Sequence, residues 1–386
     1  MTTFGPILVP SFFEETVSDA AWLAAMLNAE RALANAESRL GVIPPGAAAA
    51  IAEQCEPDRF DLSELFEQGR SVGNPAEPVV RALRARVAGD AARWVHFGAT
   101  SQDVVDTAAM LVARDAVRLL VEELAGAAGA CARLAEGHRD TPMAGRTLLQ
   151  QAVPTTFGAK AAGWLLALVS PLDALRSYRF LVQLGGAAGT LAALGELGPD
   201  VIDAYAAELE LAAPPLPWHT FRRPWAVLGG LLDEAAGACA KIGLDVVLLA
   251  QTEVGEAAEA DGGGSSTMPH KRNPVRSARA RACARLVHAN ASVLTATEHE
   301  HERAAGAWQA EWTALSEALA HAGGAAAAIR ECLEGLEVDP QRMRANMRDD
   351  LYSERDRLGI DDAAYLGSAG AFVDVALRRY RESARA

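Results

Sequence analysis

Apolar residues recur along most of this chain at the spacing of an α-helix. Between residues 103 and 136 they stand three or four positions apart, or sums of these, as on one face of a long helix. Similar segments extend over residues 154–184, 224–256 and 274–329. Helices of this length exceed the usual globular length, so the pattern predicts an extended helical bundle. In the first segment the apolar positions include Val105, Ala108, Leu111, Val112, Val117, Leu120 and Leu124.

The rest of the chain shows few signs of β-structure. A short hairpin is compatible only with the segment around residues 211–219. Proline breaks set off both ends of the chain, so we predict an all-α protein with a helical N-terminal domain over 1–98, a long-helix domain over 99–336 and a reduced helical C-terminal domain over 337–386. Alanine-rich stretches such as 325–328 allow close helix approach but leave thin cores. Such a bundle would gain stability by packing against copies of itself.

Composition narrows the classes of function. The 386 residues are 50% hydrophobic and carry a net charge of −14, with a pI near 5.1. Nucleic-acid binding needs a basic face, so we expect no such partner, although a local basic cluster can still bind a small anion. We expect no membrane span and no secretion signal, because no uncharged apolar run reaches about 18 residues and the N-terminus lacks basic and apolar regions. Scattered cysteines indicate reduced, buried thiols and a cytoplasmic location: Cys55, Cys131, Cys239, Cys283 and Cys332.

Residues 262–274 read GGGSSTMPHKRNP and form the most specific motif of the chain. Glycine tolerates backbone angles that other residues avoid, so the three glycines make a mobile lead-in to the two serines. Pro274 has a preset φ and no N–H, which suits the first position of a helix that continues from Val275. A helix start beside Lys271 and Asn273 is a favourable place for an anion.

Two further motifs share this layout of a polar loop that leads into a long helix. Residues 96–107 read HFGATSQDVVDT, in which Thr100 and Asp103 have the spacing of a capping box. Residues 145–154 read GRTLLQQAVP, and Pro154 predicts the start of another helix. Each motif alone fits ordinary helix capping. Together they predict a pocket in which hydroxyl groups and helix N-termini surround a polyanion.

The three motifs together resemble those of the fumarase/aspartase superfamily, above all its bacterial 3-carboxy-cis,cis-muconate cycloisomerase branch. The resemblance covers nearly the whole chain and includes LPWHT at 216–220 and WQAEW at 308–312. It implies an all-α, three-domain fold whose long central helices join in the bundle of a homotetramer. Each active site would then take the three motifs from three different subunits. The expected partner is a small polycarboxylate substrate, with neither cofactor nor metal.

By this resemblance Ser265, the first serine of the glycine-rich loop, is the catalytic base. A serine hydroxyl is a poor base unless its alkoxide is stabilised, and Lys271 with nearby backbone N–H groups can do that. Lys271 and Asn273 would also hold the enolate-like carboxylate of the intermediate. The implied substrate-binding residues are Thr100, Ser101, Thr147, Gln150, Ser266, Met268, Asn273 and Arg303.

Leu148 departs from the superfamily pattern in a chemically informative way. Many lyases of the superfamily carry a histidine after the threonine of the second motif, and that histidine helps to protonate the leaving group; here Leu148 follows Thr147. An amine or hydroxide needs such a general acid, whereas a carboxylate, with a pKa of about 4, can leave unprotonated. Leu148 therefore favours lactone chemistry over fumarase, argininosuccinate lyase or adenylosuccinate lyase activity. His96, beside the first motif, is the alternative general acid.

Two other charged groups invite a functional interpretation. His299 and His301 could suggest a metal site, but an i, i+2 spacing on a helix places them on different faces. Arg222 and Arg223 follow the LPWHT sequence and are either a solvated surface pair or a clamp for a substrate carboxylate. The residues alone leave that choice open.

Departures from the cycloisomerase pattern leave the substrate open. Ala278 stands where the family often has glutamate, Phe221 where it tends to have glutamine, and the segment 342–367 is shorter than in relatives. Our first hypothesis is a cofactor-free cycloisomerase or lyase acting on 3-carboxy-cis,cis-muconate in aromatic catabolism. The alternatives are a lyase for another polycarboxylate with a good leaving group, such as nitrosuccinate, and a non-catalytic structural relative. Retention of Ser265 and Lys271 argues against the last.

Overall fold

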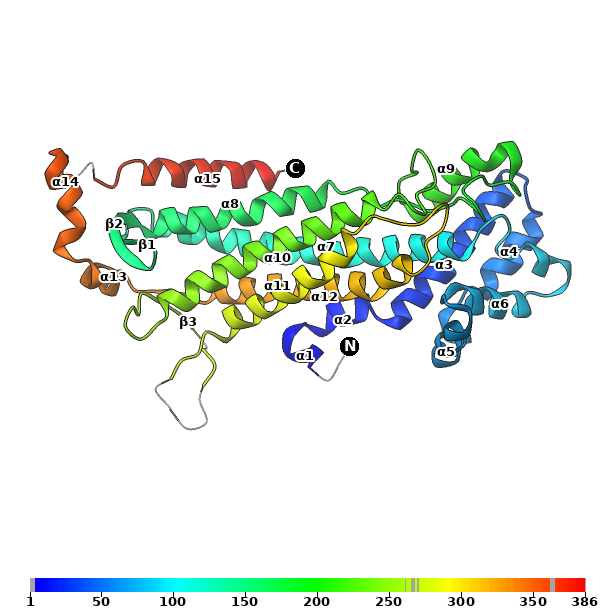
Figure 1. Cartoon of the computed structure of the whole chain (residues 1–386), viewed down its shortest axis with the longest axis horizontal. Coiled ribbons are helices and arrows are strands. Elements are labelled where there is room, and N and C mark those ends of the chain that lie inside the picture. Colours follow the sequence, from blue (N-terminus) through cyan, green and yellow to red (C-terminus); the bar gives the residue numbers. More distant parts are fainter. Residues whose placement is uncertain (1–3, 261, 265–267, 269–270, 362–364, 386) are drawn as a thin grey trace.

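Long helices dominate the architecture, as the apolar periodicity predicts. The computed structural model describes residues 4–260, 262–264, 268, 271–361 and 365–385. Five long helices lie along one another and form an elongated bundle (Figure 1). They are α7 (Ser101–Gly137), α8 (Phe157–Arg176), α10 (Arg223–Leu249), α11 (Val275–Leu294) and α12 (Ala307–Glu334).

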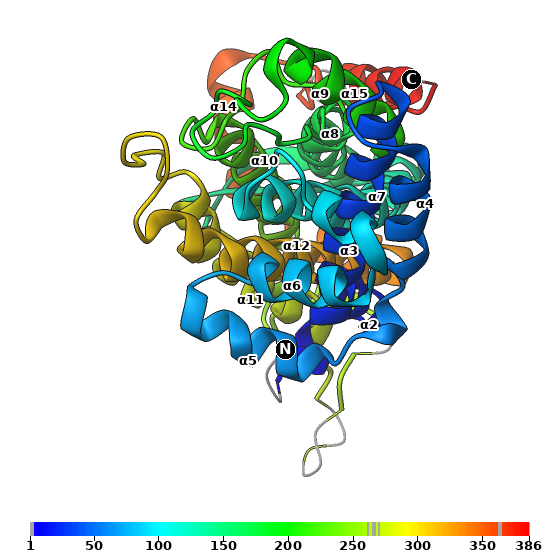
Figure 2. The same ribbon diagram turned by 90° about the vertical axis from the view of Figure 1, so that its right-hand side faces the viewer.

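The remaining helices lie at the ends of this bundle and along its sides (Figure 1). The N-terminal helices lie mainly at the end that faces the viewer in Figure 2. They are α1 (Gly5–Leu8), α2 (Ser11–Thr16), α3 (Asp19–Arg39), α4 (Pro45–Gln54), α5 (Leu62–Val72) and α6 (Ala76–Arg86), with 3-10 turns η1 (Pro57–Arg59) and η2 (Gly89–Trp94). The later ones are η3 (Gly195–Leu197), α9 (Gly198–Leu209), α13 (Pro340–Asn346), η4 (Asp349–Tyr352), α14 (Ser353–Leu358) and α15 (Ala369–Ser383).

Small residues let the N-terminal segment approach the bundle closely. Gly323 and Gly324 lie in the middle of α12. A Cβ atom on Gly323 would stand 2.4 Å from the ring of Phe13, and one on Gly324 would stand 2.6 Å from the carbonyl oxygen of Leu8. Any larger residue there would separate α1 and α2 from α12. The alanine-rich stretch 325–328 that follows is buried, and the five cysteines are free and buried.

The predicted helix over 274–329 is wrong, because the chain breaks between α11 and α12. Residues 295–306 are not helical, and Gly306, with φ of 120°, precedes α12. The break carries no apolar stripe that would bury it in the bundle. Its Arg303 side chain instead reaches the start of α7, which holds the segment as a loop.

The second motif forms a β-hairpin that the periodicity did not predict. β1 (Pro142–Thr147) pairs antiparallel with β2 (Gln150–Thr156), with a register irregularity between Ala144 and Arg146. Pro154 therefore lies in a strand and does not open a helix. A strand can hold a proline beside a bulge, and the register irregularity is adjacent to Pro154. Helix α8 starts three residues later, where the Thr156 hydroxyl caps it by accepting the N–H of Ala159.

The short hairpin with which the sequence around residues 211–219 is compatible does not form. Around residues 211–219 the described chain has only an isolated parallel bridge between Leu181 and Ala212. A second two-stranded sheet joins β3 (Ala257–Glu259) to β4 (Leu336–Val338). This pairing ties the chain just before the glycine-rich motif to the end of α12.

Candidate active site

The first motif starts α7 and is organised around the buried carboxylate of Asp103. Asp103 accepts the backbone N–H of Thr100 at 2.9 Å, as in the predicted capping box. It also accepts the N–H groups of Gly185 and Gly186, both at 2.9 Å, and lies 2.6 Å from Nε2 of His219. These four partners satisfy a carboxylate that is removed from water. Asp103 is thus a structural centre for this end of the molecule.

Arg303 and Thr100, both predicted to bind substrate, meet at this helix start. Nη1 of Arg303 donates to the Thr100 hydroxyl at 2.9 Å, and its Nε donates to Oε1 of Gln102 at 2.8 Å. Gln102 in turn donates to the backbone oxygen of His219 at 2.8 Å. Burial lowers the pKa of Arg303, and the charge of Asp103 opposes that effect. The structure therefore brings a guanidinium and a hydroxyl together beside a positive helix end, a suitable environment for a carboxylate.

Arg222 is neither a surface residue nor exposed toward a ligand, so both interpretations of the arginine pair are wrong for this residue. It is buried, and its guanidinium donates to Asp106 at 2.7 and 2.9 Å and to Glu311 at 3.1 and 2.5 Å. The indole of Trp308 also donates to Asp106, at 3.0 Å. Arg223, by contrast, is exposed. This buried network joins α7, the start of α10 and α12 and so supports the Thr100–Arg303 contact.

His299 and His301 lie in the loop before α12, so the helical spacing used to separate them does not apply. Nε2 of His299 is 3.3 Å from Glu311, and burial lowers the pKa of His299. His301 is exposed. Among the residues that the structure describes, no group of three or more His, Cys, Asp or Glu side chains could hold a metal ion.

His96 lies in the turn before α7 and pairs with a buried carboxylate. Its Nδ1 is 2.6 Å from Oε1 of Glu30 on α3. Burial lowers the pKa of His96. The charge and hydrogen bond of Glu30 and the charge of Asp103 raise this pKa by more than burial lowers it, so the pKa lies above its ordinary value. Nothing in the local sequence identified Glu30 as this partner, because it is 66 positions away.

Glu37, two turns along α3 from Glu30, is buried with no hydrogen-bond partner for either carboxylate oxygen. Burial, with the charge of Glu30, raises the pKa of Glu37 from 4.5 to about 9. The folded protein therefore binds a proton that the unfolded chain releases, and stability falls as pH rises from about 4.5 toward 9.

We expect Glu37→Met to stabilise the protein at alkaline pH. The apolar side chain of similar size removes the cost of keeping this carboxyl protonated. That cost is about 1.4 kcal/mol for each pH unit above 4.5, or roughly 5 kcal/mol near pH 8. Urea unfolding at pH 5 and pH 8, at fixed protein concentration, measures the difference. The stabilisation should be much larger at pH 8. An equal effect at both pH values would show that Glu37 does not titrate in this range.

The second motif places Thr147 and Gln150 at the tip of the β1–β2 hairpin. They are paired in register and exposed, and the turn between them consists of Leu148 and Leu149. Both leucines have positive φ, 49° and 63°, and are 96% and 77% exposed. Such backbone angles are costly for leucine, and water is a poor environment for it. The hairpin base is fixed by Arg146, which donates to buried Glu256 at 2.7 and 2.9 Å.

The third motif is described at its base. Gly263 and Asn273 form an antiparallel bridge, with N–H to oxygen distances of 3.0 and 3.1 Å. Lys271 and Met268 are exposed. Pro274 is the N-cap of α11, one position before the predicted one. The predicted base Ser265 and its neighbour Ser266 lie outside the described residues.

One chain does not bring the first motif to the other two. The first motif precedes the 37 residues of α7, which span about 55 Å, and the hairpin follows them. In Figure 1 the hairpin and β3, which precedes the third motif, lie at the end of the bundle opposite to α9 and α4. The contacts of Asp103 with His219 and of Arg146 with Glu256 mark these two ends. The predicted site residues are thus separated within a chain.

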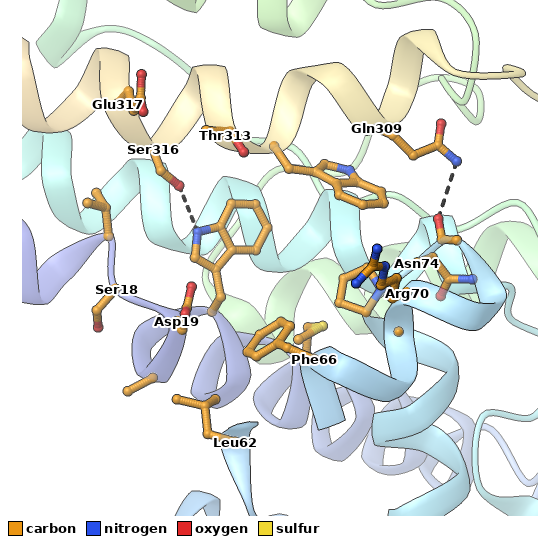
Figure 3. Close-up of a pocket in the computed structure, with 18 of the residues that line it drawn as sticks. Ser18, Asp19, Leu62, Phe66, Arg70, Asn74, Gln309, Thr313, Ser316 and Glu317 are labelled. Atoms are coloured by element: carbon orange, nitrogen blue, oxygen red, sulfur yellow. Dashed lines mark hydrogen bonds between the residues drawn. The ribbon is translucent and has the colours of Figure 1, made fainter. Parts of the chain in front are cut away.

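Neither of two cavities in the described part of the chain brings the predicted residues of the three motifs together. A cavity of about 890 Å³ lies between the starts of α3 and α12 and helix α5 (Figure 3). Its described lining contains none of the residues predicted for catalysis or substrate binding. Its aromatic lining residues include Trp22, Phe66 and Trp312, and the Trp22 indole donates to Ser316 at 2.9 Å. Gln150 lines a separate cavity of about 680 Å³ beside Asn346.

Comparison with known proteins identifies the family. The sequence profile of a family described as lyase matches residues 8–288. The crystal structure of a 3-carboxy-cis,cis-muconate lactonizing enzyme from Pseudomonas putida superposes with a TM-score of 0.92, covering 99% of each chain at 35% identity. This chain belongs to the fumarase/aspartase superfamily. It is an enzyme of that superfamily, and its all-α fold is the one that the motifs implied.

Two curated relatives frame the question of substrate. A nitrosuccinate lyase from Streptomyces davaonensis is 49% identical over 89% of this chain and 76% of its own length. A 3-carboxy-cis,cis-muconate cycloisomerase from Bradyrhizobium diazoefficiens is 42% identical over 98% of this chain and 89% of its own length.

In the described part of the enzyme, no helix has the length and apolarity needed to cross a membrane.

Proposed function

We propose that this enzyme is a cofactor-free cycloisomerase that interconverts 3-carboxy-cis,cis-muconate and a carboxymuconolactone, as part of aromatic catabolism. The observation that carries the proposal is in the second motif. There Leu148 occupies the position at which many relatives have a histidine that acts as a general acid. Its side chain is exposed at the hairpin tip between Thr147 and Gln150. A leucine cannot donate a proton, so the leaving group must be stable as an anion, as a carboxylate is.

The proposed reaction moves one proton and breaks one carbon–oxygen bond. In the lactone-opening direction Ser265, activated by Lys271, removes the proton α to a carboxylate. The electron pair passes through an enolate-like intermediate held by Lys271 and Asn273, and the lactone oxygen leaves as the second carboxylate. Arg303 and Thr100, which lie in contact, bind a remaining carboxylate. The reverse sequence closes the ring.

We also propose a homotetramer whose active sites combine the motifs of different subunits. The separation of the motifs along α7 supports this arrangement, because one chain cannot assemble them. Exposed apolar groups at the hairpin tip, Leu148 and Leu149, support it further, since a neighbouring subunit would cover them. His96 would belong to the part of this shared site that contains Thr100 and Arg303.

A second candidate is elimination of nitrite from nitrosuccinate. The 49% identity to a nitrosuccinate lyase favours it. Nitrite, like a carboxylate, leaves as a stable anion, so the same active-site residues suit both reactions. Elimination of an amine or an alcohol does not fit, because these leaving groups need a general acid and Leu148 cannot donate a proton.

An ultraviolet assay with four substrates tests the proposal. We expect turnover of 3-carboxy-cis,cis-muconate, with nitrosuccinate as the alternative, and no detectable turnover of argininosuccinate or adenylosuccinate. Leu148→His should not create amine release on its own. Efficient release of an amine by the wild-type enzyme would contradict the proposal and would assign the missing acid to His96.

A further inference from the structure

His96 has one ring nitrogen fixed and the other available. Nδ1 is 2.6 Å from Oε1 of Glu30, whose side chain is buried. A carboxylate only accepts, so Nδ1 must carry a hydrogen. Nε2 has no hydrogen-bond partner among the described residues, and the side chain remains 13% exposed. The pair therefore has a direction: Glu30 holds the inner nitrogen, and Nε2 is the atom that can meet a ligand.

The backbone around His96 is held in an uncommon conformation. Its φ is 62°, in the left-handed region that non-glycine residues seldom adopt. Arg84 on α6 donates to the backbone oxygen of Val95 at 3.1 Å, which fixes the residue before it. Gly98, with φ of 70°, packs so closely that a Cβ atom would stand 2.9 Å from Leu194. Conformations of this kind persist only where the surroundings enforce them, and they are frequent in active sites.

Three charged groups act on His96. Glu30 on α3 and Asp103 on α7 favour the imidazolium, while burial and Arg84 on α6 oppose it. Glu37, also on α3, is protonated at neutral pH and adds no charge, because its pKa is about 9. Asp103 also accepts the N–H of Thr100, so His96 and Thr100 share one neighbour. The His96 ring thus lies in the turn that leads into the same helix start as the Thr100–Arg303 contact.

We propose that Glu30 is a positioning residue that presents His96 through Nε2–H to a carboxylate of the substrate. His96 then donates a hydrogen bond to the substrate carboxylate, as Thr100 and Arg303 do, and it takes part in no covalent step. The inference rests on the proposed function for the identity of the substrate. It follows that the substrate carries an anionic group at this end, whatever its leaving group is.

Histidine NMR tests the pairing without any turnover. The enzyme is labelled at its histidines, the His96 signal is assigned with His96→Gln, and tricarballylate serves as a stable tricarboxylate probe. In the wild-type enzyme we expect His96 to carry hydrogen on Nδ1, to titrate above an ordinary histidine, and to shift at Nε2 when tricarballylate is added. A His96 signal that titrates normally and ignores tricarballylate would overturn the proposal, even if muconate is turned over.

Two matched variants on α3 separate positioning from packing. Glu30→Gln removes a charged acceptor, whereas Glu37→Gln replaces a protonated carboxyl by an amide of the same shape. We expect Glu30→Gln to move the His96 titration to lower pH and to raise KM by about ten- to a hundredfold near pH 8, with a smaller change in kcat. Glu37→Gln should leave the His96 titration in place. A Glu30→Gln variant that loses stability but keeps the wild-type His96 titration would show a structural role only.

The same measurements distinguish this inference from the proposed function. Failure to turn over muconate, with the Nε2 response to tricarballylate intact, would reject the substrate and keep the positioning role. Should Glu30→Gln fail to fold, Glu30→Asp retains the charge and should retain the raised titration of His96. Loss of the raised titration in a folded Glu30→Asp variant with an intact Nδ1 hydrogen bond would overturn the role of the carboxylate.

Discussion

Arg222→Ala is expected to destabilise the enzyme by roughly 3–5 kcal/mol, the usual cost of removing one partner from a buried ion pair. Arg222 holds two buried carboxylates, those of Asp106 and Glu311, and without it both lose their charged partner. Its guanidinium also lies 4.8 Å from the ring centre of Trp218, so packing is lost as well. Thermal and urea unfolding at fixed protein concentration measure the effect.

The loss should depend on pH in a defined direction. Burial raises the pKa of Glu311 to about 7, and Arg222 opposes that rise in the wild-type enzyme. Without Arg222 the folded state favours protonated Glu311 still more strongly, so the variant should be least impaired at low pH and most impaired above pH 7. Arg223→Ala is the matched control, because the adjacent arginine is exposed and its loss should change stability by less than about 0.5 kcal/mol. Equal effects at the two positions would contradict the structural role of Arg222.

Mixing Thr147→Ala and Ser265→Ala subunits is expected to restore activity that neither variant has alone. Each variant should lose about a thousandfold or more of kcat/KM, Ser265→Ala because the base is gone and Thr147→Ala because a substrate contact is gone. If an active site takes these two residues from different subunits, random reassembly of a symmetric tetramer leaves about a quarter of the sites intact. Thr147 is exposed at the hairpin tip, so its truncation should spare the fold.

The experiment requires subunit exchange, achieved by mild denaturation and refolding of the mixture. Recovery near a quarter of wild-type activity supports shared sites. A mixture that remains inactive, while wild-type subunits treated in the same way regain activity, would contradict them. A protein that is monomeric by light scattering and fully active in kinetic assays would also contradict shared sites.

The helical architecture could be predicted because its signals are local. The apolar stripe of residues 103–136 lies within one segment, and α7 covers it from Ser101 to Gly137. The capping box joins residues three positions apart and was also predicted correctly. The break at 295–306 was missed, since the flanking helices share one periodic pattern. The hairpin was missed because Pro154 was assigned to a helix start, although its partner strand allows a proline beside a bulge.

For the candidate site, the sequence predicted residue types better than their surroundings. Arg303 and Thr100 were both assigned to substrate binding, and they are in contact. Arg222 was assigned to the surface or to the substrate and is in neither place. The roles of Ser265 and Lys271 remain predictions from the motif.

What the sequence alone determined is whatever depends on neighbours within a few turns of helix: the long amphipathic helices, the start of α7, and the motifs that mark the superfamily. The tertiary structure decided the state of the charged groups. Arg222 meets Asp106 and Glu311 across 116 and 89 positions of the chain, and His96 meets Glu30 across 66. A side chain's charge and exposure depend on which distant groups replace its water, and only the folded chain brings those groups together.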